Sequence, residues 1–410
     1  MSRSSRKHGV RLGTSLRVER LEDRQMLSGI GLSSLLGNAL SALQSLTTQG
    51  AQVANQFLNQ VATGIPTAGK PAATRALDRY EPDDTSALAT TIPTTGALQT
   101  HTLDVSADVD WVKFTLTQTT DVVIETRGTV GDTRMSLYGQ DAVNPLQFDD
   151  NSGVGKFSRI LRAGTDTSGG HHPALAAGTY YVKVDAAPHL TAITYTIGVT
   201  SVQPGDMFLV QSTTNPTDIL ISTPIRVGEA AQLKVPYSST YYHAALYLGN
   251  DRVAEMLGTG FTDRSTLETL YAHNTWIDVY RRSGIGSDGQ AVVDAVEKYV
   301  GTPYAYTELG VFGLAYLMPN SPSLIKSSFI YTAYKRSDYG TKAMICSELV
   351  ARAFAEAQTA DHRSLAVSVT PWPAIAKLAS ATGDTSTDFA MDFTSPTMLS
   401  LSPSLVKLDA

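Results

Sequence analysis

The chain has a single cysteine, Cys346, among its 410 residues. An intrachain disulfide is therefore excluded, and so is a zinc site built on paired cysteines. No apolar run approaches the length of about 18 residues that a transmembrane helix needs, so we expect no membrane-spanning segment. The formal net charge of −6 gives no reason to expect nucleic-acid binding, because proteins with that function carry a basic surface.

Charge is distributed unevenly along a chain that is too long for one typical domain. Residues 1–28 form a basic arm, whereas residues 29–69 contain no Asp, Glu, Lys or Arg. Leucines recur at helical spacing in this uncharged segment, so residues 29–74 are predicted to form a weakly helical linker. The alternative is an amphipathic helix that lies on a partner or a membrane surface.

The basic arm ends in Val18-Glu19-Arg20-Leu21-Glu22-Asp23-Arg24-Gln25-Met26-Leu27-Ser28. This segment resembles the LEPR-x-LL-type N-terminal segment of planctomycete exported proteins, although Asp23 stands where that pattern has Pro and Met26 where it has Leu. The resemblance implies export or sorting to the cell envelope. No apolar stretch of the kind found in ordinary secretory signals follows the arm, and a solvated basic tail is the alternative.

Residues 75–202 contain short alternating runs separated by Gly, Asp and Asn, a pattern typical of a small β-sandwich. Five motifs occur here in a fixed order: Tyr80-Glu81-Pro82-Asp83-Asp84, Asp108-Val109-Asp110-Trp111-Val112-Lys113-Phe114, Gly131-Asp132-Thr133, Asp149-Asp150-Asn151-Ser152-Gly153 and Ala177-Gly178-Thr179-Tyr180-Tyr181-Val182-Lys183-Val184. The series resembles the bacterial pre-peptidase C-terminal domain. That resemblance implies a jelly-roll-like accessory module of secreted peptidases, which itself does no chemistry.

Some members of that fold bind calcium through acidic loops, so the resemblance makes calcium a candidate ligand. The hard carboxylate oxygens of Asp83, Asp84, Asp108, Asp110, Asp149 and Asp150 are suited to that ion. The alternative is that these side chains cap the backbone of their own turns, which is the commoner use of aspartate there.

Residues 203–385 change to an α+β pattern. Strands are predicted at 207–210, 241–249 and 252–257, and helices at 289–300 and 345–357. Residues 386–410 are rich in Ser and Leu with two Ser-Pro steps, and we expect a short tail there. The predicted chain is therefore multidomain: an all-β sandwich, then an α+β domain.

Three residues of the α+β domain supply the chemistry of thiol catalysis. Cys346 lies at the start of a predicted helix, whose dipole favours the reactive thiolate. His243 could pair with this thiolate and protonate a leaving group. Glu255 would orient the imidazole through its second nitrogen. Each residue alone has a structural explanation, because a lone buried cysteine or a strand histidine commonly only packs.

The hairpin between His243 and Glu255 imposes a geometric condition on this triad. With a two-residue turn at Asn250-Asp251, the two side chains would point to opposite faces of the sheet. With a three-residue turn that includes Gly249, they would share a face. The triad therefore requires the odd loop, a bulge or a register shift.

Five blocks follow one another in this region: Pro204-Gly205-Asp206, His243-Ala244-Ala245-Leu246-Tyr247-Leu248-Gly249, Val253-Ala254-Glu255, Gly301-Thr302-Pro303-Tyr304 and Ile345-Cys346-Ser347-Glu348-Leu349-Val350. In this order they resemble the circularly permuted papain-like amidases of the YiiX/YaeF type, relatives of the NlpC-type cell-wall peptidases. Carried over by position, Cys346 is the nucleophile, His243 the base and acid, and Glu255 the orienting residue. Tyr304 would line the cleft. The residues from 305 to 345 depart from the family as an insertion.

The leading hypothesis is an exported cysteine hydrolase that cleaves a peptide or lipid-linked amide through a Cys346 acyl-enzyme. It implies no metal or organic cofactor for the chemistry and suggests envelope or cell-wall material as the substrate. Acyl transfer or lipid ester cleavage on the same triad is one alternative. A non-catalytic adhesion or binding protein of the envelope is another.

Overall fold

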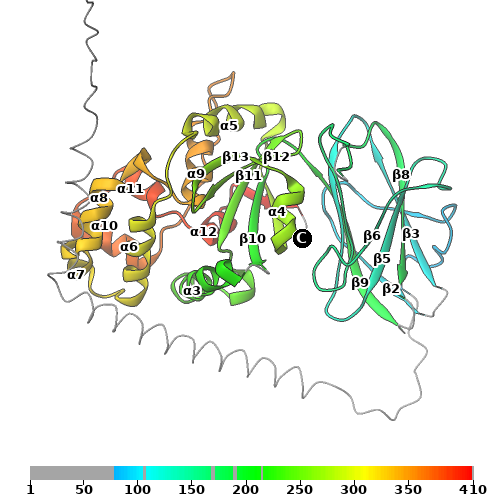
Figure 1. The fold of residues 1–410 in the computed structure, drawn as a ribbon, viewed down its shortest axis with the longest axis horizontal. Helices are drawn as coiled ribbons and strands as arrows, with labels where there is room; N and C mark the ends of the chain where they lie inside the picture. The colour runs from blue at the N-terminus through cyan, green and yellow to red at the C-terminus, as the bar shows by residue number, and fades with distance from the viewer. Residues whose placement is uncertain (1–77, 105–107, 168–170, 188–191, 214–215, 409–410) are drawn as a thin grey trace, which may run out of the picture. The chain divides into compact units, whose positions relative to one another are not determined.

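The computed structural model describes residues 78–104, 108–167, 171–187, 192–213 and 216–408 (Figure 1). The predicted basic arm at 1–28 and the predicted linker at 29–74 lie outside these residues. No helix within the described ranges is both long and apolar enough to cross a membrane.

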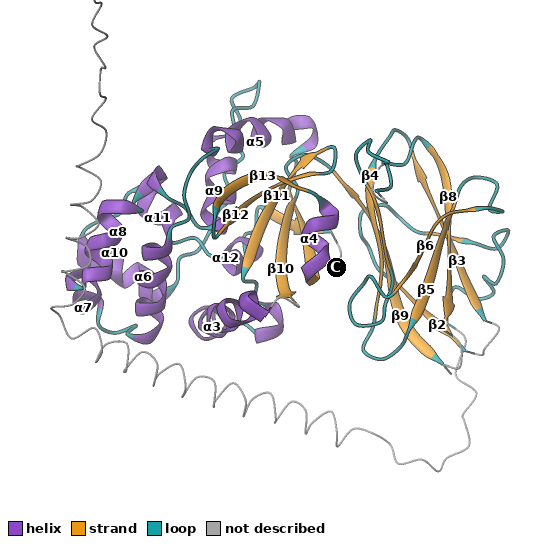
Figure 2. Cartoon of the chain, viewed as in Figure 1, coloured by secondary structure: helices purple, strands orange, loops and turns teal. Residues whose placement is uncertain are grey.

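Residues from 90 to 202 form two facing sheets (Figure 2). The first has the order β1-β3-β8-β5-β6, made of β1 (Thr90–Thr91), β3 (Val109–Leu116), β8 (Gly178–Ala186), β5 (Thr133–Tyr138) and β6 (Pro145–Asp150). The second has the order β2-β9-β4-β7, made of β2 (Gln99–Leu103), β9 (Ile193–Val202), β4 (Asp121–Arg127) and β7 (Arg159–Arg162).

The two sheets bury one common core, which explains the alternating sequence. In β5, Met135 and Leu137 are fully buried, whereas the residues between them are only partly covered. Phe114, Val182 and Ile197 from other strands belong to the same core cluster. Successive side chains of a strand point to opposite faces, so this pattern places every second residue inside. The predicted β-sandwich is confirmed.

A separate antiparallel sheet follows, with the order β13-β12-β11-β10-β14-β15. Its strands are β10 (Met207–Thr213), β11 (His243–Gly249), β12 (Arg252–Leu257), β13 (Gly260–Ser265), β14 (Asn274–Arg282) and β15 (Leu405–Lys407). The central strands are apolar on both faces because both faces are covered. Leu209 and Leu246 join one core cluster, whereas Phe208 and Tyr247 join another.

Helices complete this α+β region. Side chains of α5 (Gly289–Val296) and α9 (Cys346–Glu356) share a core with one face of β10, β11 and β12, and α4 (Leu267–His273) packs on the other face. A second helical group has its own core around Phe312, Tyr334 and Trp372. It consists of α6 (Tyr306–Leu317), α7 (Pro322–Ser327), α8 (Phe329–Ser337), α10 (Pro373–Thr382) and α11 (Thr387–Asp392), so the insertion at 305–345 forms three of its helices. Among the described residues, the other α-helices are α3 (Pro216–Leu233) and α12 (Pro396–Ser400), and short 3-10 helices occur at Tyr237–Ser239, Gly286–Asp288, Glu297–Tyr299 and Gly340–Lys342.

The expected tail at 386–410 is wrong, because residues through Lys407 are part of the folded region. They form α11, α12 and β15, and β15 pairs with β14. The two helices begin at serine caps: Ser386 accepts the N–H of Phe389, and Ser395, followed by Pro396, accepts that of Met398. Serine at the cap and proline at the first helical position are signals for the start of a helix. The prediction of a tail was based on composition alone and did not use them.

Candidate active site

Cys346 is the first residue of α9, as predicted. Ile345 before it is extended (φ −94°, ψ 168°) and provides no side-chain cap for the helix. The first N–H groups of a helix have no partner within it, and the dipole makes this end positive. The N–H of Ser347 is hydrogen-bonded to the thiol, whose residue is only 6% exposed. The local backbone therefore favours an anion at the sulfur atom.

The β11–β12 hairpin meets the geometric condition through a bulge. Ala245 faces Glu255 and Tyr247 faces Val253, but Gly249 faces Arg252, so the register shifts beside the turn. Gly249, Asn250 and Asp251 all have positive φ values, which glycine and the short polar residues tolerate best. Because His243 precedes Ala245 by two residues, it shares the sheet face of Glu255 as a diagonal neighbour.

The side chains of His243 and Glu255 are in direct contact. His243 Nε2 lies 2.8 Å from Glu255 Oε2, and both side chains are largely buried. This contact leaves Nδ1 as the ring nitrogen available to the thiol, and the imidazole is hydrogen-bonded to Cys346. The three predicted residues are thus brought together in a chain of contacts from Cys346 on α9 through His243 on β11 to Glu255 on β12.

The charges of the three groups support one another. Burial alone would raise the pKa of the Cys346 thiol, but the charge and hydrogen bond of His243, with the N–H groups of Ala244 and Ser347, lower it overall. Burial alone would lower the pKa of His243, yet the thiolate and Glu255 raise it. Each shift stabilises an imidazolium beside a thiolate, which is the reactive form of the pair.

A fourth group extends this chain of contacts. The side chain of Ser265, the last residue of β13, is hydrogen-bonded to Glu255. Burial would raise the pKa of Glu255, but His243 and then Ser265 lower it overall, so the carboxylate stays ionised. Ser265 was not a sequence candidate, because only the pairing of β12 with β13 brings it near Glu255.

Tyr304 lies beside the thiol, where the sequence placed it. Met344 donates its N–H to Pro303 O (3.1 Å), and its carbonyl accepts the N–H of Ala305 (2.9 Å). These bonds hold the backbone at Tyr304 against Met344, which precedes Cys346 by two residues. Burial, then the charge of Cys346, raises the pKa of Tyr304. Its ring centroid is 4.9 Å from that of the exposed Tyr306.

A second candidate site lies in the sandwich. Carboxylate oxygens of Glu81, Asp83 and Asp110 lie within 4.8 Å of one another, and so do ligand atoms of Asp78, His101 and Asp110. Asp83 and Asp110 are fully buried, and both oxygens of Asp83 and Oδ1 of Asp110 have no hydrogen-bond partner among the described residues. Burial, followed by neighbouring carboxylates, raises the pKa of Asp83 to about 7.

Among the described residues, no lysine or arginine forms an ion pair with these acids, and Asp83 Oδ2 lies 3.5 Å from Nδ1 of His101. The pKa of Asp110 is raised to about 9 by burial, against a hydrogen bond from Tyr195. Burial lowers the pKa of His101 to about 4, so its ring is neutral near pH 7. Oxygen ligands that repel one another in a buried space fit a hard divalent cation such as calcium.

The predicted calcium ligands are separated by the fold, and two of them, Asp83 and Asp110, belong to the acidic cluster. Asp110 lies in the cluster, and the charge of Asp108 acts on both Asp83 and Asp110. Asp149 instead accepts the N–H groups of Ser152 (3.2 Å) and Arg159 (2.8 Å), which is the capping role that competed with metal binding. Asp150 ends β6 and is exposed.

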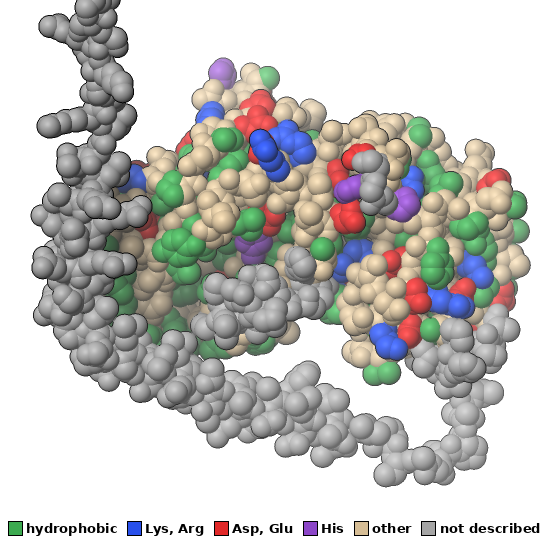
Figure 3. Space-filling view, in the orientation of Figure 1, with side chains coloured by type: hydrophobic (Ala, Val, Ile, Leu, Met, Phe, Trp, Pro, Cys, Tyr) green, Lys and Arg blue, Asp and Glu red, His purple; other side chains and the backbone are tan. Residues whose placement is uncertain are grey.

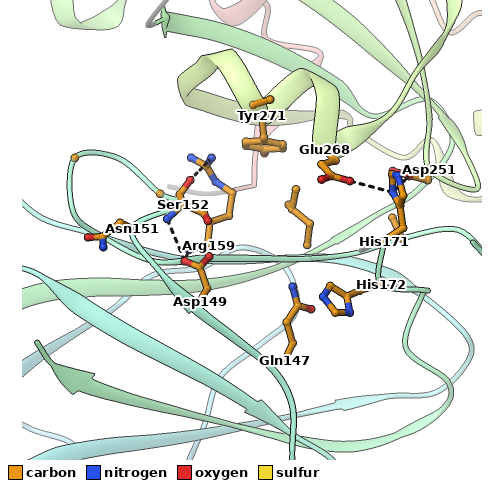
Figure 4. Close-up of a pocket in the computed structure, with 15 residues that line it drawn as sticks. Gln147, Asp149, Asn151, Ser152, Arg159, His171, His172, Asp251, Glu268 and Tyr271 are labelled. Carbon is orange, nitrogen blue, oxygen red and sulfur yellow. Dashed lines mark hydrogen bonds and ion pairs between the residues drawn. The ribbon is translucent and has the colours of Figure 1, made fainter. Parts of the chain in front are cut away.

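A cavity of about 650 Å³ lies elsewhere, lined by residues of the β6–β7 loop, the β11–β12 turn and α4 (Figure 4). Arg159 stacks over Tyr271 there, and His171 Nδ1 lies 3.0 Å from Glu268. Cys346, His243 and Glu255 do not line it, so this cavity is separate from the candidate active site. On the face drawn in Figure 3, lysine and arginine side chains are interspersed with acids rather than gathered in one patch.

The sandwich matches a known family of domains. Residues 108–186 match the family described as the bacterial pre-peptidase C-terminal domain, within the range predicted for it. No curated protein sequence matches the chain. For the residues from 203 onward, the papain-like resemblance remains a prediction.

Three solved structures similar to the chain each cover less than a third of it. One is the pre-peptidase C-terminal domain of a collagenase from Bacillus anthracis, with 13% identity and a TM-score of 0.22, covering 31% of this chain and 100% of that one. Another is PliG, a periplasmic inhibitor of g-type lysozyme from Aeromonas hydrophila (12% identity, TM-score 0.21, 28% and 97% coverage). The PliG of Salmonella Typhimurium has 13% identity and a TM-score of 0.20, with 28% and 100% coverage.

Proposed function

We propose that the protein is a cysteine hydrolase that cleaves an amide bond through an acyl-enzyme on Cys346. The observation that carries the proposal is the buried contact chain from the thiol at the start of α9 through His243 to Glu255, with 2.8 Å between the last two. The order of these elements also supports the finer assignment to the circularly permuted papain-like amidases, because the histidine strand precedes the cysteine helix.

The reaction follows from this arrangement. The thiolate of Cys346 attacks the substrate carbonyl carbon and forms a C–S bond, and the uncapped N-terminal N–H groups of α9 face the developing oxyanion. His243, as imidazolium, gives its proton to the leaving nitrogen as the C–N bond breaks. It then takes a proton from water, whose oxygen attacks the thioester carbonyl and releases the acid and the thiolate. Glu255 stabilises the charged imidazole throughout.

The single cysteine makes a direct test simple, because only Cys346 can be alkylated by iodoacetamide as a thiol. The rate is measured from pH 5 to 9 in the wild-type protein, in His243→Ala and in His171→Ala as a control. At pH 6 an ordinary thiol with a pKa of about 8.5 is only about 0.3% thiolate. We expect a wild-type rate at pH 6 that falls about 100-fold in His243→Ala and is unchanged in His171→Ala. An ordinary thiol titration in all three proteins would contradict the ion pair.

The chemistry itself is tested with p-nitrophenyl acetate as a generic acyl donor. Rapid acid quench and mass analysis of the Cys346 peptide should find an acetyl thioester in the wild type and none in Cys346→Ser. Addition of an amine or alcohol acceptor distinguishes hydrolysis from acyl transfer, which is the alternative on the same triad. A reactive thiol that never becomes acylated would favour the non-catalytic binding protein instead.

We further propose that the sandwich holds calcium and that the protein is exported. The first proposal is supported by the buried oxygens of Asp83 and by Oδ1 of Asp110, which accept no hydrogen bond among the described residues, with Glu81 completing the ligand set. The family match at 108–186 and the LEPR-x-LL-like arm support the second. Calorimetric titration with Ca²⁺ after chelator treatment tests the site, and cell fractionation with and without residues 1–28 tests export.

A further inference from the structure

The insertion from residue 305 to 345 has an exposed apolar face. On α6, Tyr306 and Leu317 are 63% and 46% exposed, and on α8 Phe329 is 62% exposed. A Cβ added at Gly313, which lies between the two α6 residues, would meet open space. Tyr306, Gly313 and Leu317 are spaced by seven and four residues, so they form one stripe along the helix. With Phe329 and the exposed Ile330 of α8, they make up the apolar face.

The charge distribution of α6 is unusual for a helix at a protein surface, because the helix exposes no charged side chain. Its only charged residue, Glu308, is fully buried. The side of α6 opposite the apolar face is apolar too, with Val311 and Phe312 in the core of the helical group. A helix that is apolar all round normally lies inside a protein or against a partner or a membrane. The exposed side of α6 therefore indicates a docking surface.

The apolar face extends from α6 onto its neighbour α8 (Figure 2). A Cβ added at Gly310 of α6 would lie 3.0 Å from Ile330 of α8, so the glycine lets the two helices approach closely. Thr307 Oγ1 lies 3.3 Å from Ser337 Oγ, which joins the start of α6 to the end of α8. The two helices are therefore antiparallel neighbours, and their exposed apolar residues form a continuous surface.

The charges that the insertion presents to solvent are all positive. Its acids, Glu308 and Asp338, are both buried, whereas its cations are Lys326, Lys335, Arg336 and Lys342. Lys335 is paired with Asp384 (2.9 Å), but among the described residues no acid forms an ion pair with Arg336 or Lys342. A basic surface of this kind, in a chain with a net charge of −6, is complementary to an anionic partner.

The positions of the cations favour a lipid surface as that partner. Arg336 follows Phe329 by seven residues, or about two turns, so both side chains project from the same side of α8. Lys342 Nζ lies 3.3 Å from the carbonyl oxygen of Arg336. Leucine and phenylalanine flanked by lysine and arginine are typical of surfaces that rest on anionic lipid. A second copy of the chain fits less well, because a twofold contact through this face would bring like charges together.

The apolar face begins beside the candidate active site. The hydroxyl of Tyr306 donates to Gly258 O (2.6 Å), and the ring centroid of Tyr306 is 4.9 Å from that of Tyr304. Leu257, the exposed residue before Gly258, ends β12 two residues after Glu255. A partner that covers Tyr306 and Leu257 would therefore lie close to the triad.

We propose that the apolar face of α6 and α8 docks on an anionic phospholipid membrane. Leu317 and Phe329 enter the acyl-chain region, and Arg336 and Lys342 contact the headgroup phosphates. Docking brings the lipid surface beside Cys346, so that a lipid-linked amide can reach the thiol. This last step rests on the proposed function, whereas docking itself does not.

The test places a fluorescent nitrobenzoxadiazole probe, whose emission rises in an apolar environment, at one cysteine of the full chain. Cys346→Ser first removes the only native thiol. Leu317→Cys then gives a labelling position on α6, and Leu257→Cys one beside the triad. Val143→Cys, at an exposed apolar residue between β5 and β6 of the sandwich, is the matched control. Emission is recorded with vesicles of phosphatidylcholine alone and of phosphatidylcholine mixed with phosphatidylglycerol.

We expect emission at position 317 to rise about threefold or more on the vesicles that contain phosphatidylglycerol, with a rise at position 257 and none at position 143. Arg336→Gln combined with Lys342→Gln should raise the lipid concentration at half of the full response about 25-fold, because each cation near an anionic membrane contributes about fivefold. Lys298→Gln, on an exposed lysine outside the apolar face, should leave that concentration unchanged.

An unchanged emission at position 317, or an equal rise at positions 317 and 143, would overturn the proposal even if the protein sediments with the vesicles. A rise without vesicles that grows with protein concentration would assign the face to a second copy of the chain. A rise with soluble polyglutamate but not with vesicles would assign it to an acidic protein. Either result would also overturn the proposal.

The probe at position 257 decides where the membrane lies relative to the triad. A rise at position 317 without one at position 257 would overturn the placement of lipid beside Cys346. Every labelled protein lacks the Cys346 thiol, so these results do not depend on catalysis. If the thiol proves unreactive in the wild type, the proposed function fails, while the probe measurements still decide whether the face docks on lipid.

Discussion

The protein buries two groups of acids, and they are balanced in different ways. In the sandwich, the buried Asp83 and Asp110 lie beside the partly buried Glu81, and Asp83 lies 3.5 Å from His101, whose ring is neutral near pH 7. Around α9, the buried Glu348 and Asp392 and the half-exposed Asp388 form ion pairs with the guanidinium of Arg352. The first arrangement is the one for which we propose a cation from solution, whereas the second has its own cation in Arg352.

The difference shows that the secondary structure around buried acids affects which kind of group can neutralise them. The sandwich acids lie on a strand and a loop, where several oxygens can converge on one point. The α9 acids lie on helices that pack closely, so a planar guanidinium with several N–H groups can bridge them. The pair of Cys346 and His243 is a third solution, in which a thiolate and an imidazolium neutralise each other.

Removal of the built-in cation should have the largest effect. In Arg352→Met, the acids around α9 would resemble those of the sandwich, and we expect the free energy of unfolding at pH 7 to fall by about 3–5 kcal/mol. The loss should be smaller at pH 5, where the acids take up protons. Urea unfolding measures it, with Arg363→Met on an exposed ion pair as the control expected to cost under about 1 kcal/mol. An equal loss of unfolding free energy in both variants would show that Arg352 does not neutralise the buried acids around α9.

Supplying a cation to the sandwich should stabilise it. At about 100 times the dissociation constant, Ca²⁺ should add about 2.7 kcal/mol to the stability, seen as a higher melting temperature that chelator reverses. Asp83→Asn should abolish the response, because it removes a buried oxygen charge. Asp149→Asn, whose carboxylate caps its own loop, should keep it. A calcium response that survives Asp83→Asn would place the ion elsewhere.

The thiol pair should depend on its own carboxylate. In Glu255→Gln, the imidazolium loses a negative neighbour at 2.8 Å, and we expect the alkylation rate of Cys346 at pH 6 to fall about tenfold or more. Glu268→Gln removes the acid beside His171 and serves as the matched control. If both variants keep the wild-type rate, Glu255 does not orient His243, and the reactive thiol depends on Cys346 and His243 alone.

The smallest effect is expected at Ser265, whose side chain supports Glu255 from β13. A neutral hydroxyl contributes about 0.5–1.5 kcal/mol in such a bond, and most of that should appear as stability. We expect Ser265→Ala to lower the alkylation rate at pH 6 by about twofold and Ser265→Thr to restore it. A tenfold loss of the alkylation rate in Ser265→Ala would instead mean that Ser265 is as important for the reactive thiol as Glu255.

Local patterns made the main elements predictable. The strand at 252–257 matches β12, and the helix predicted at 345–357 matches α9 to within one residue at each end. Cys346, His243 and Glu255 could be chosen because a helix start and a hairpin are local features with clear geometric rules. The triad required a bulge or an odd loop in this hairpin, and the structure has the bulge at Gly249. The sequence could not predict it, because glycine beside Asn-Asp permits two turn lengths.

Other parts depended on contacts between distant segments. Asp392 lies in what composition marked as a tail, yet Arg352 and Tyr334 bind it from two other helices. Asp149 and Asp110 carry the same side chain, and only the fold separates the capping residue from the one in the acidic cluster. A carboxylate's partners are not encoded in its neighbours along the chain.

The sequence by itself determined the alternation of the sandwich strands, the helix that begins at Cys346 and the residue types able to perform thiol chemistry. These follow from side-chain periodicity and backbone preferences, which act over a few residues. Tertiary structure decided which groups meet: Glu255 with His243, Asp83 with Asp110, and Asp392 with Arg352. Burial sets the energy of a charge, and burial exists only once distant segments have packed together.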